Sequence, residues 1–270
     1  MSMVETAPRF QDTKIFGLTQ DVRHGHIWLW RTVVAMLIGS ALMIVFQFFD
    51  ARLINGVSVW DKPAKFFLSL AVQYATVSWA LSQMPRASAK LPSIDWAAAL
   101  MLIAGWGEMA YIIFRASRAE ASHFNSSSLS GAIGYGLMGV GALTLTFTAA
   151  FIGWRIWRKR SHGLWTETAG IALMIGAVLG TAAGIYMSSH TSHWVGGAQT
   201  DAGGLVLFNW STTGGDLRVA HFVGLHAAQF IPLAAMSGDR RVVYGAAIVT
   251  IFLTAAIFAM SASGVPLFRA

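Results

Sequence analysis

The residues best able to do chemistry in this chain gather in the segment GGDLRVAHFVGLHAAQFIP, residues 214–232. It places Asp216, Arg218, His221 and His226 in or beside an apolar run with the composition of a membrane helix. Ionisable groups are costly in hydrocarbon, so their presence in such a helix indicates a functional site by default. We therefore expect the outer half of this helix to line a cavity surrounded by protein or water.

The two histidines of this helix are expected to have different roles. Successive residues of an α-helix are about 100° apart, so His221 and His226 point roughly 140° apart and cannot grip one ion from one helix face. His226 lies deeper, and its neighbours Gly224 and Ala228 predict room for a large planar group. Pro232 lacks a backbone donor, which predicts a kink close to it. Asp216 is the expected N-cap of the helix.

A second polar stripe is expected on the third apolar segment. Glu108, Tyr111, Arg115 and Arg118 are spaced by three, four and three residues, which places them on one helix face. Glu108 is the acid well inside the segment, where a carboxylate is either a functional group or a paired group that fixes helix packing. If the helix continues outward, Glu120 and His123 also share a face.

A long connection, residues 188–217, follows the fifth apolar segment and carries no lysine or arginine. Its aromatic residues and three Gly-Gly pairs predict a lid packed on the membrane surface. His190 and His193 lie at its start. The candidate metal ligands that share the predicted outer side are His123, His190, His193, His221 and His226.

The composition identifies the broad class of protein. Of 270 residues, 55% are hydrophobic and 11% are charged, against about 25% charged in soluble domains. The chain has no cysteine, which excludes disulfides, thiolate zinc sites and iron–sulfur clusters. Its net charge of +7 comes from basic residues that mostly flank apolar segments, so we expect membrane lipids and not nucleic acid as partners.

The expected fold is an all-α integral membrane protein, a bundle of seven transmembrane helices in residues 28–262. Spans of about 20 apolar residues are needed to cross a bilayer. Seven segments qualify: 28–49, 64–84, 94–114, 129–154, 167–187, 218–236 and 242–260. Residues 1–27 are expected to form a cytoplasmic lead, since they lack the pattern of a signal peptide.

The lysines and arginines predict the orientation. The sequences RIWRKR and SGDRR fall on the inner side when the N-terminus is cytoplasmic and the C-terminus outside. This is the arrangement expected of a multi-pass protein of a bacterial inner membrane. Gly176, Gly180 and Gly184 repeat every four residues on the fifth span and predict close helix packing within the chain.

The leading hypothesis for the chemistry is a b-type haem protein for electron transfer, with a quinone or a redox protein as partner. His226 or His221 would be one axial ligand and His123, His190 or His193 the other. The candidate partners of the haem propionates are Arg115, Arg118 and Arg218. The segment RVAHFVGLHAAQ resembles arginine- and histidine-bearing helices of membrane cytochromes b and haem-processing proteins. That resemblance implies histidine ligation of haem.

A second hypothesis is a zinc-dependent hydrolase acting on a lipid at the outer leaflet, with Glu120 as general base and Glu108 as a further candidate catalytic acid or base. The segment RAEASHFNSSS resembles the acidic and asparagine motifs of seven-span ceramidase-like hydrolases, which implies a zinc site. The seventh span here has no histidine.

Two further hypotheses stay open. In a proton- or ion-coupled transporter or channel, Glu108 and the histidines would relay protons or bind a cation. In a structural subunit, the same polar groups would hold helices together.

Overall fold

The computed structural model describes residues 24–85, 88, 91–125 and 128–269 and is mostly helical (72%). Most of the expected N-terminal lead lies outside the described residues. The long helices are α1 His24–Phe46, α2 Asp61–Ser82, α3 Pro92–Ser117, α4 Leu129–Trp157, α5 Leu164–Ser189 and α8 Arg240–Ala262. The shorter ones are α6 Leu217–Leu225, α7 Ala227–Ala234 and the 3-10 turns η2 Arg160–His162 and η3 Ala235–Ser237.

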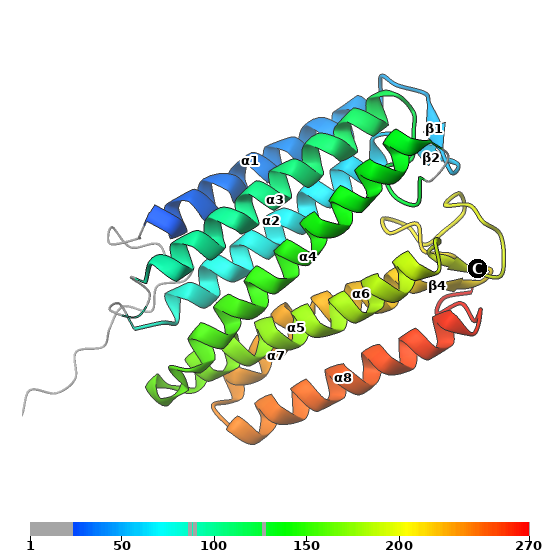
Figure 1. The fold of residues 1–270 in the computed structure, drawn as a ribbon. Helices are drawn as coiled ribbons and strands as arrows, with labels where there is room; N and C mark the ends of the chain where they lie inside the picture. The colour runs from blue at the N-terminus through cyan, green and yellow to red at the C-terminus, as the bar shows by residue number, and fades with distance from the viewer. Residues whose placement is uncertain (1–23, 86–87, 89–90, 126–127, 270) are drawn as a thin grey trace, which may run out of the picture.

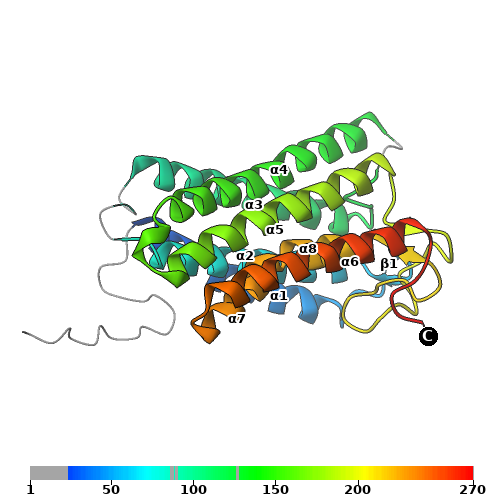
Figure 2. The same ribbon diagram turned by 90° about the horizontal axis from the view of Figure 1, so that it is seen from below.

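Successive long helices run antiparallel, with α6 and α7 together forming one bent pass, and the bundle has two groups, α1–α4 and α5–α8 (Figures 1 and 2). Helix α1 packs against α2 and α3, and α4 packs against α3 and α5. Helix α5 is central to the second group, because it packs against α4, α6, α7 and α8. Consistent with this position, Ile171, Ala172 and Leu173 are all buried.

The apolar helices indicate a membrane-embedded protein. Five of the described helices, α1, α3, α4, α5 and α8, are long and apolar enough to cross a membrane. The bent pair α6–α7 makes a sixth if it is taken as one span. Helix α2 has the length but carries more polar side chains, among them Lys65, Gln73 and Thr76.

The sixth span is broken where the sequence predicted one helix over 218–236. Helices α6 and α7 meet at His226 with a bend of 46°. The kink expected near Pro232 is therefore misplaced by six residues. The amide of Gln229 donates to the carbonyl of His226 at 2.9 Å, a tighter turn than the regular bond to Leu225. Pro232 lies inside α7, where it removes the regular helix donor for the carbonyl of Ala228.

The glycines of α5 and α6 let these two helices approach closely, as the spacing of Gly176, Gly180 and Gly184 predicted. A Cβ on Gly176 would lie 2.9 Å from the carbonyl oxygen of Leu225. One on Gly184 would lie 3.3 Å from the ring of His221. The space expected beside His226 for a planar group is thus taken by α5, a correction to the sequence-based interpretation.

One end of the bundle carries the folded connections and is called the loop end here. It includes the hairpin of β1 Leu53–Ile54 and β2 Val57–Ser58, whose turn residues Asn55 and Gly56 both have positive φ. This is the Asn-Gly type I′ turn, which matches the twist of paired strands. In the connection 188–217, β3 Trp194–Val195 pairs antiparallel with β4 Gly215–Asp216.

The connection 188–217 folds over the loop end. The amide of Asp201 donates to the carbonyl of Asn55 at 2.9 Å, which attaches the connection to the β1–β2 hairpin. Asn209 Nδ2 donates to Asp61 Oδ2 at 3.0 Å, at the start of α2. The segment therefore links the α5–α8 group to the α1–α4 group, as a lid would.

The substitution Gly224→Ala tests the close approach of α5 and α6. Its Cβ would lie 3.0 Å from Leu179 Cβ and 3.1 Å from the Gly180 nitrogen, so α5 has to shift. We expect a loss of about 1–3 kcal/mol in the free energy of unfolding, measured by thermal unfolding in detergent. Gly245→Ala on α8 is the matched control, because its Cβ meets nothing within 4 Å. Equal stability of the two variants would contradict this packing.

Candidate functional site

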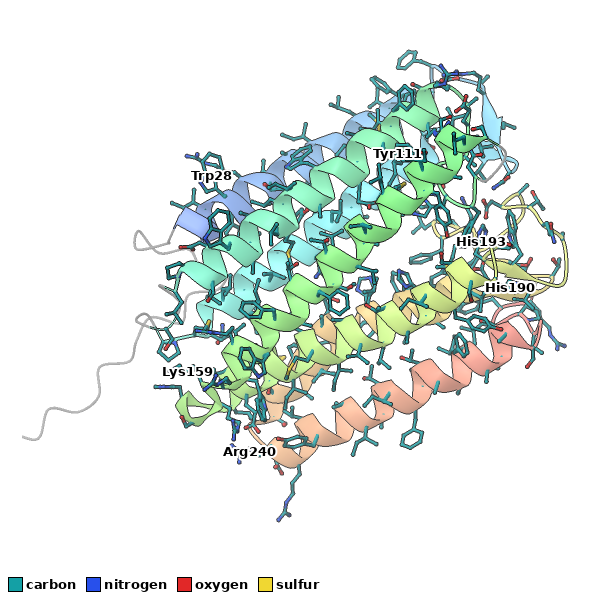
Figure 3. All side chains as sticks on the ribbon, viewed as in Figure 1. Trp28, Tyr111, Lys159, His190, His193 and Arg240 are labelled. Atoms are coloured by element: carbon teal, nitrogen blue, oxygen red, sulfur yellow. The ribbon has the colours of Figure 1, made fainter. Side chains whose placement is uncertain are left out.

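Polar side chains converge at the loop end between the two helix groups. Figure 3 shows His193 and His190 there, with Tyr111 on the neighbouring part of α3, whereas Lys159 and Arg240 lie at the opposite end. The contacts of these side chains come from α2, α3, α6 and the two connections 118–128 and 188–217.

Lys62, at the start of α2, contacts the connection between α3 and α4. Its Nζ lies 2.9 Å from His123 Nδ1, and Ser122 Oγ lies 3.1 Å from the same nitrogen. Burial, together with the neighbouring Lys62 charge, holds the pKa of His123 well below its usual range. The ring is therefore neutral, and its Nδ1 can accept a hydrogen bond from the ammonium group.

Aromatic rings surround His123. Phe66 and Tyr135 have ring centroids 5.5 Å and 6.0 Å from it, and Phe124 lies at 6.3 Å. Phe124 also lies 6.1 Å from the ring of His193. These rings separate the Lys62–His123 contact from the next polar group and limit the access of water to both.

His193 belongs to a chain of charges that ends at α6. Its Nε2 lies 3.5 Å from Asp201 Oδ1, which in turn lies 2.8 Å from Arg218 Nη1. Arg218 Nη2 also donates to Asp216 Oδ2 at 2.7 Å. The backbone fixes this arrangement, because the amide of Leu217 donates to the carbonyl of His193 at 2.9 Å.

Burial and charge act in opposite directions on this chain. Desolvation lowers the pKa of His193 below 6.5, although the contact with Asp201 works against it. For Asp201, desolvation raises the pKa, but the contact with His193 and the charge of Arg218 outweigh it and the net shift is downward. Near neutral pH, His193 is thus neutral and Asp201 ionised.

Glu108 lies deeper, on the face of α3 that packs against α4. Glu108 is 6% exposed. Its carboxyl group occupies the space that a Cβ atom on residue 141 would need, and residue 141 is glycine. Glycine at that position gives the carboxyl group its space. Among the described residues, no hydrogen bond or ion pair to this carboxylate is formed, and Lys62 is the cation whose charge acts on it.

Tyr111 and Arg115 lie on α3 as the predicted polar stripe requires, whereas Arg118 is the C-cap just beyond the helix, and all three side chains have partners. Tyr111 packs against Gly134 of α4 and accepts a hydrogen bond from Arg115 Nε at 2.9 Å. Arg115 also pairs with Glu120, and Arg118 Nε lies 3.0 Å from the other oxygen of Glu120.

Glu120 and His123 would share a helix face only if α3 continued outward, and it does not. Helix α3 ends at Ser117, and Ala119 has a positive φ of 53°, which turns the chain away. Glu120 then accepts from two arginines, and these contacts hold its pKa below its usual range. His123 points instead to Lys62. The geometry gives Glu120 the role of an ion-pair partner and does not support that of a general base.

The other three predicted ligands, His221, His226 and His190, each have different contacts. His221 Nδ1 lies 2.8 Å from the carbonyl oxygen of Gly180, which leaves Nε2 as its other polar atom. His226 lies at the helix break, with its ring 4.0 Å from that of Phe222. His190 is exposed and stacks on Tyr186 at 6.2 Å. No group of three or more His, Asp or Glu side chains suited to a metal ion occurs in the described part of the chain.

The expected haem environment is only partly present. All three arginines assigned to propionates are paired with carboxylates: Arg115 and Arg118 with Glu120, and Arg218 with Asp201 and Asp216. A cavity between α2, α4, α5, α6 and α7 measures about 10 Å³, close to the volume of one water molecule and far below that of a porphyrin. The haem and zinc sites stay predictions, and the described geometry gives them little support.

Lys62 and Asp201 are not among the site residues predicted from the sequence. The sequence places Lys62 among the possible partners of Glu108 and Asp201 on the outer side with the histidines. Their contacts with His123 and His193 could not be predicted, because they depend on how the connections fold.

The chain matches no family model, no curated protein and no solved structure in the three comparisons.

Acidification should weaken the loop end through His193. The pKa of His193 is lowered in the folded protein, so between that pKa and 6.5 the unfolded chain binds more protons, and stability falls as the pH falls through this window. Asp201, whose pKa is also lowered, adds a further loss below about 3.8. We expect the unfolding temperature in detergent to drop between about pH 7 and pH 5.

The drop should be smaller in His193→Gln. The matched control is His190→Gln, because His190 is exposed and outside the chain of charges. Identical pH dependence in the wild type and in His193→Gln would show that His193 does not carry the effect.

Proposed function

We propose that this chain is a proton-coupled transporter or channel of the inner membrane, with Glu108 as the proton-binding group. The observation that carries the proposal is a buried carboxyl group with no ion pair among the described residues, close to the Lys62–His123 contact. Intramembrane carboxylates in such surroundings mark proton relays and ion pathways. Lys62 offsets the charge of Glu108 when the carboxyl group is deprotonated.

Seven spans are part of this proposal. Helix α2 has 22 residues, which corresponds to roughly 33 Å, enough to cross the hydrocarbon core. It packs against α1, α3 and α4, and its polar residues Gln73 and Thr76 are half-buried. Asp61, Lys62 and Lys65 all lie in its first two turns, at the loop end.

The basic residues support a cytoplasmic N-terminus. The end opposite the loop end carries Arg155, Arg158, Arg160, Arg240 and Arg241. The guanidinium of Arg160 lies 4.1 Å from the ring centroid of Trp157, and that of Arg158 lies 5.1 Å from Trp154. An excess of arginine is typical of the cytoplasmic side, and tryptophan is typical of a membrane interface on either side. The loop end would then face the outside.

Access to Glu108 is proposed to come from the loop end. A second polar contact lies deeper than the Lys62–His123 pair, between Gln229 Nε2 and Thr76 Oγ1 at 2.7 Å. Nearer the opposite end, Leu81, Ile152 and Ile156 are fully buried, and the buried polar side chains Thr166 and Glu167 have bonding partners of their own. The proposed path lets a proton reach Glu108 from the loop end, and delivery to the other side requires a change in helix packing.

The break at His226 is a reasonable place for such a change. Discontinuous helices in membrane transporters lie near the midplane and line the binding site. The α6–α7 bend lies at this level and contacts α5 through glycines, which resist sliding less than large side chains do. The proposal therefore assigns proton binding to Glu108 and the conformational step to α6–α7.

The substitution Glu108→Gln tests the proposal. In proteoliposomes with an imposed membrane potential, the wild type should acidify or alkalinise the lumen, read from an enclosed pH-sensitive dye. Glu108→Gln keeps the shape of the side chain but cannot ionise, so proton flux should fall to the level of protein-free liposomes. Glu120→Gln is the matched control and should retain flux, since Glu120 pairs with arginines outside the path. Wild-type flux in Glu108→Gln would overturn the assignment.

A b-type haem protein is the second candidate, favoured by one contact. Metal-binding histidines usually donate their other ring nitrogen to a carbonyl oxygen, as His221 Nδ1 can to Gly180. Purified protein from haem-supplemented cells should then show a Soret band that His221→Gln abolishes. A spectrum without haem bands would remove this candidate. Nothing in the described geometry favours the zinc-dependent hydrolase over these two.

A further inference from the structure

The end of the bundle opposite the loop end carries a dense group of basic side chains. Two segments there, residues 155–167 of α4, η2 and α5 and residues 239–244 at the start of α8, hold six basic residues and two acids. The basic residues are Arg155, Arg158, Lys159, Arg160, Arg240 and Arg241, and the acids are Glu167 and Asp239. Figure 3 shows Lys159 and Arg240 together at this end.

Both acids of this end have partners within the chain. Glu167 is buried, and its two oxygens contact Arg240 Nη2 at 2.8 Å and the hydroxyl of Tyr244 at 2.7 Å. Asp239 caps α8 and accepts from the amide of Arg241 at 2.8 Å. Among the described residues, the basic residues of this end other than Arg240 form no ion pair. An excess of positive charge is therefore free to bind an anion from outside the chain.

Arg160 and Arg240 lie on either side of one position beside Tyr244. The turn η2, which holds Arg160, packs against α5, and the Tyr244–Glu167 bond joins the start of α8 to α5. The charges of Arg240 and Arg160 both act on the hydroxyl of Tyr244, so both guanidinium groups are close to it. The guanidinium of Arg160 stacks on the ring of Trp157 at 4.1 Å, which leaves the N–H donors at its edge free.

An exposed apolar stripe on α8 begins beside these two arginines. Tyr244, Ile248 and Ile251 are spaced by four and three residues, which places them on one helix face. They are 42%, 54% and 39% exposed. Helix α8 is long and apolar enough to cross a membrane, so these side chains face the acyl chains of lipids. Cations at one end of an apolar stripe match a lipid with an anionic headgroup.

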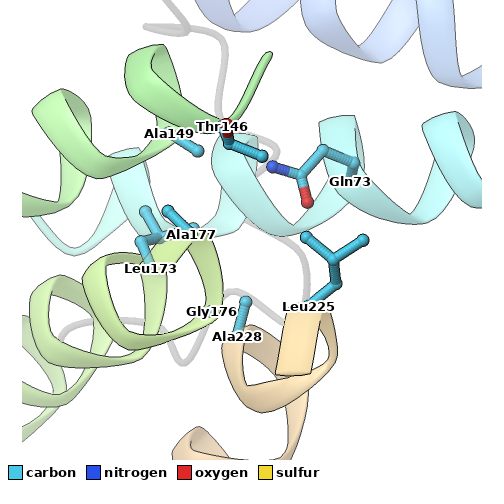
Figure 4. A pocket seen from close by; sticks show the side chains of 8 residues that line it. All are labelled: Gln73, Thr146, Ala149, Leu173, Gly176, Ala177, Leu225 and Ala228. Atoms are coloured by element: carbon cyan, nitrogen blue, oxygen red, sulfur yellow. The ribbon is translucent and has the colours of Figure 1, made fainter. Parts of the chain in front are cut away.

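The interior of the bundle offers no comparable place for such a ligand at its small cavity. The cavity between α2, α4, α5, α6 and α7 measures about 10 Å³ and is lined mainly by apolar side chains, with Gln73 and Thr146 as its polar residues (Figure 4). It is too small for a phosphate group. The arginines at the end of the bundle are exposed, and a headgroup reaches them from the membrane surface.

We propose that Arg160 and Arg240 bind the phosphate of an anionic phospholipid whose acyl chains lie along Tyr244, Ile248 and Ile251 of α8. A guanidinium group binds phosphate oxygens through two N–H donors, and basic pockets between membrane helices bind anionic lipid headgroups. A zwitterionic lipid brings its own ammonium group next to the arginines and binds less tightly. The site rests neither on the proposed proton path nor on the proposed orientation in the membrane.

Native mass spectrometry of the purified full-length chain in detergent tests the site. In titrations with phosphatidylglycerol, the wild type should bind one lipid about tenfold more tightly than phosphatidylcholine with the same acyl chains. Arg160→Gln removes a cation that has no partner in the chain and should weaken phosphatidylglycerol binding by about tenfold. Arg240 is left unchanged, because its removal would leave the buried carboxylate of Glu167 without its cation.

Arg158→Gln is the matched control for Arg160→Gln. It removes the same charge from the same end of the bundle, but Arg158 stacks on Trp154 at 5.1 Å and does not act on Tyr244. Phosphatidylglycerol should bind to this variant as it does to the wild type. An equal loss in the two variants would reveal a general attraction to the charged end and would overturn the site.

A second measurement covers the case in which Arg160→Gln fails to fold. Phosphatidylglycerol should raise the unfolding temperature of the wild type saturably, whereas its deacylated headgroup, glycerophosphoglycerol, should not. Equal stabilisation by the deacylated headgroup would indicate a phosphate site without a lipid, and equal stabilisation by phosphatidylcholine would indicate binding without the arginines; either result overturns the proposal. Glu108→Gln should bind phosphatidylglycerol normally even if its proton flux is lost, so the two proposals are tested separately.

Discussion

The carboxyl group of Glu108 is buried on α3 without an ion pair among the described residues, and the neighbouring residues of α2 and α4 accommodate it. Burying Glu108 costs about 2.5–3.5 kcal/mol even on insertion scales that allow relaxation. Gly141 supplies the space for its side chain, and Lys62 supplies a positive charge within reach. A leucine at this position would pack as well as the glutamate and would avoid the cost of burying a carboxyl group. The presence of glutamate therefore argues for a function.

The second constraint is the close contact of α5 with α6–α7. Gly176, Gly180 and Gly224 remove side chains from the interface, so two backbones meet without interlocking large groups. In lipid, helix association depends on such packing and on interhelical hydrogen bonds. The His221–Gly180 contact is one of these bonds. Helix α5 therefore occupies the space that a haem would need beside His226. The break of α6–α7 packs against a face of α5 that is formed by glycines.

The sequence predicted the helices well because apolar length and glycine spacing are local properties. Six of the seven predicted spans correspond to helices or a bent helix pair that pass the length and hydropathy test, and the second corresponds to α2. The glycine repeat on α5 and the Asp216 N-cap were also correct, since both depend on neighbouring residues. The break at His226 could not be placed, because Pro232 fixes a missing donor but not the turn at which the helix bends.

The site was predicted less completely than the fold. The stripe of Glu108, Tyr111 and Arg115 follows from helix periodicity and is present. Partners across the bundle do not follow from periodicity: Lys62 meets His123, and Asp201 meets His193, through the fold of the connections. One positive φ at Ala119 was enough to separate Glu120 from His123. Such turns depend on tertiary contacts that a single sequence does not display.

The most direct measurement of the central claim is infrared difference spectroscopy of the Glu108 carboxyl group in lipid. Spectra of wild type and Glu108→Gln would be recorded while the bulk pH is changed. If Glu108 binds protons from the loop end, the wild type will show a protonated-carboxyl band that titrates with bulk pH and is missing from the variant. A band that ignores bulk pH, or spectra that do not differ, would mean that Glu108 is a sealed structural group and would contradict the account.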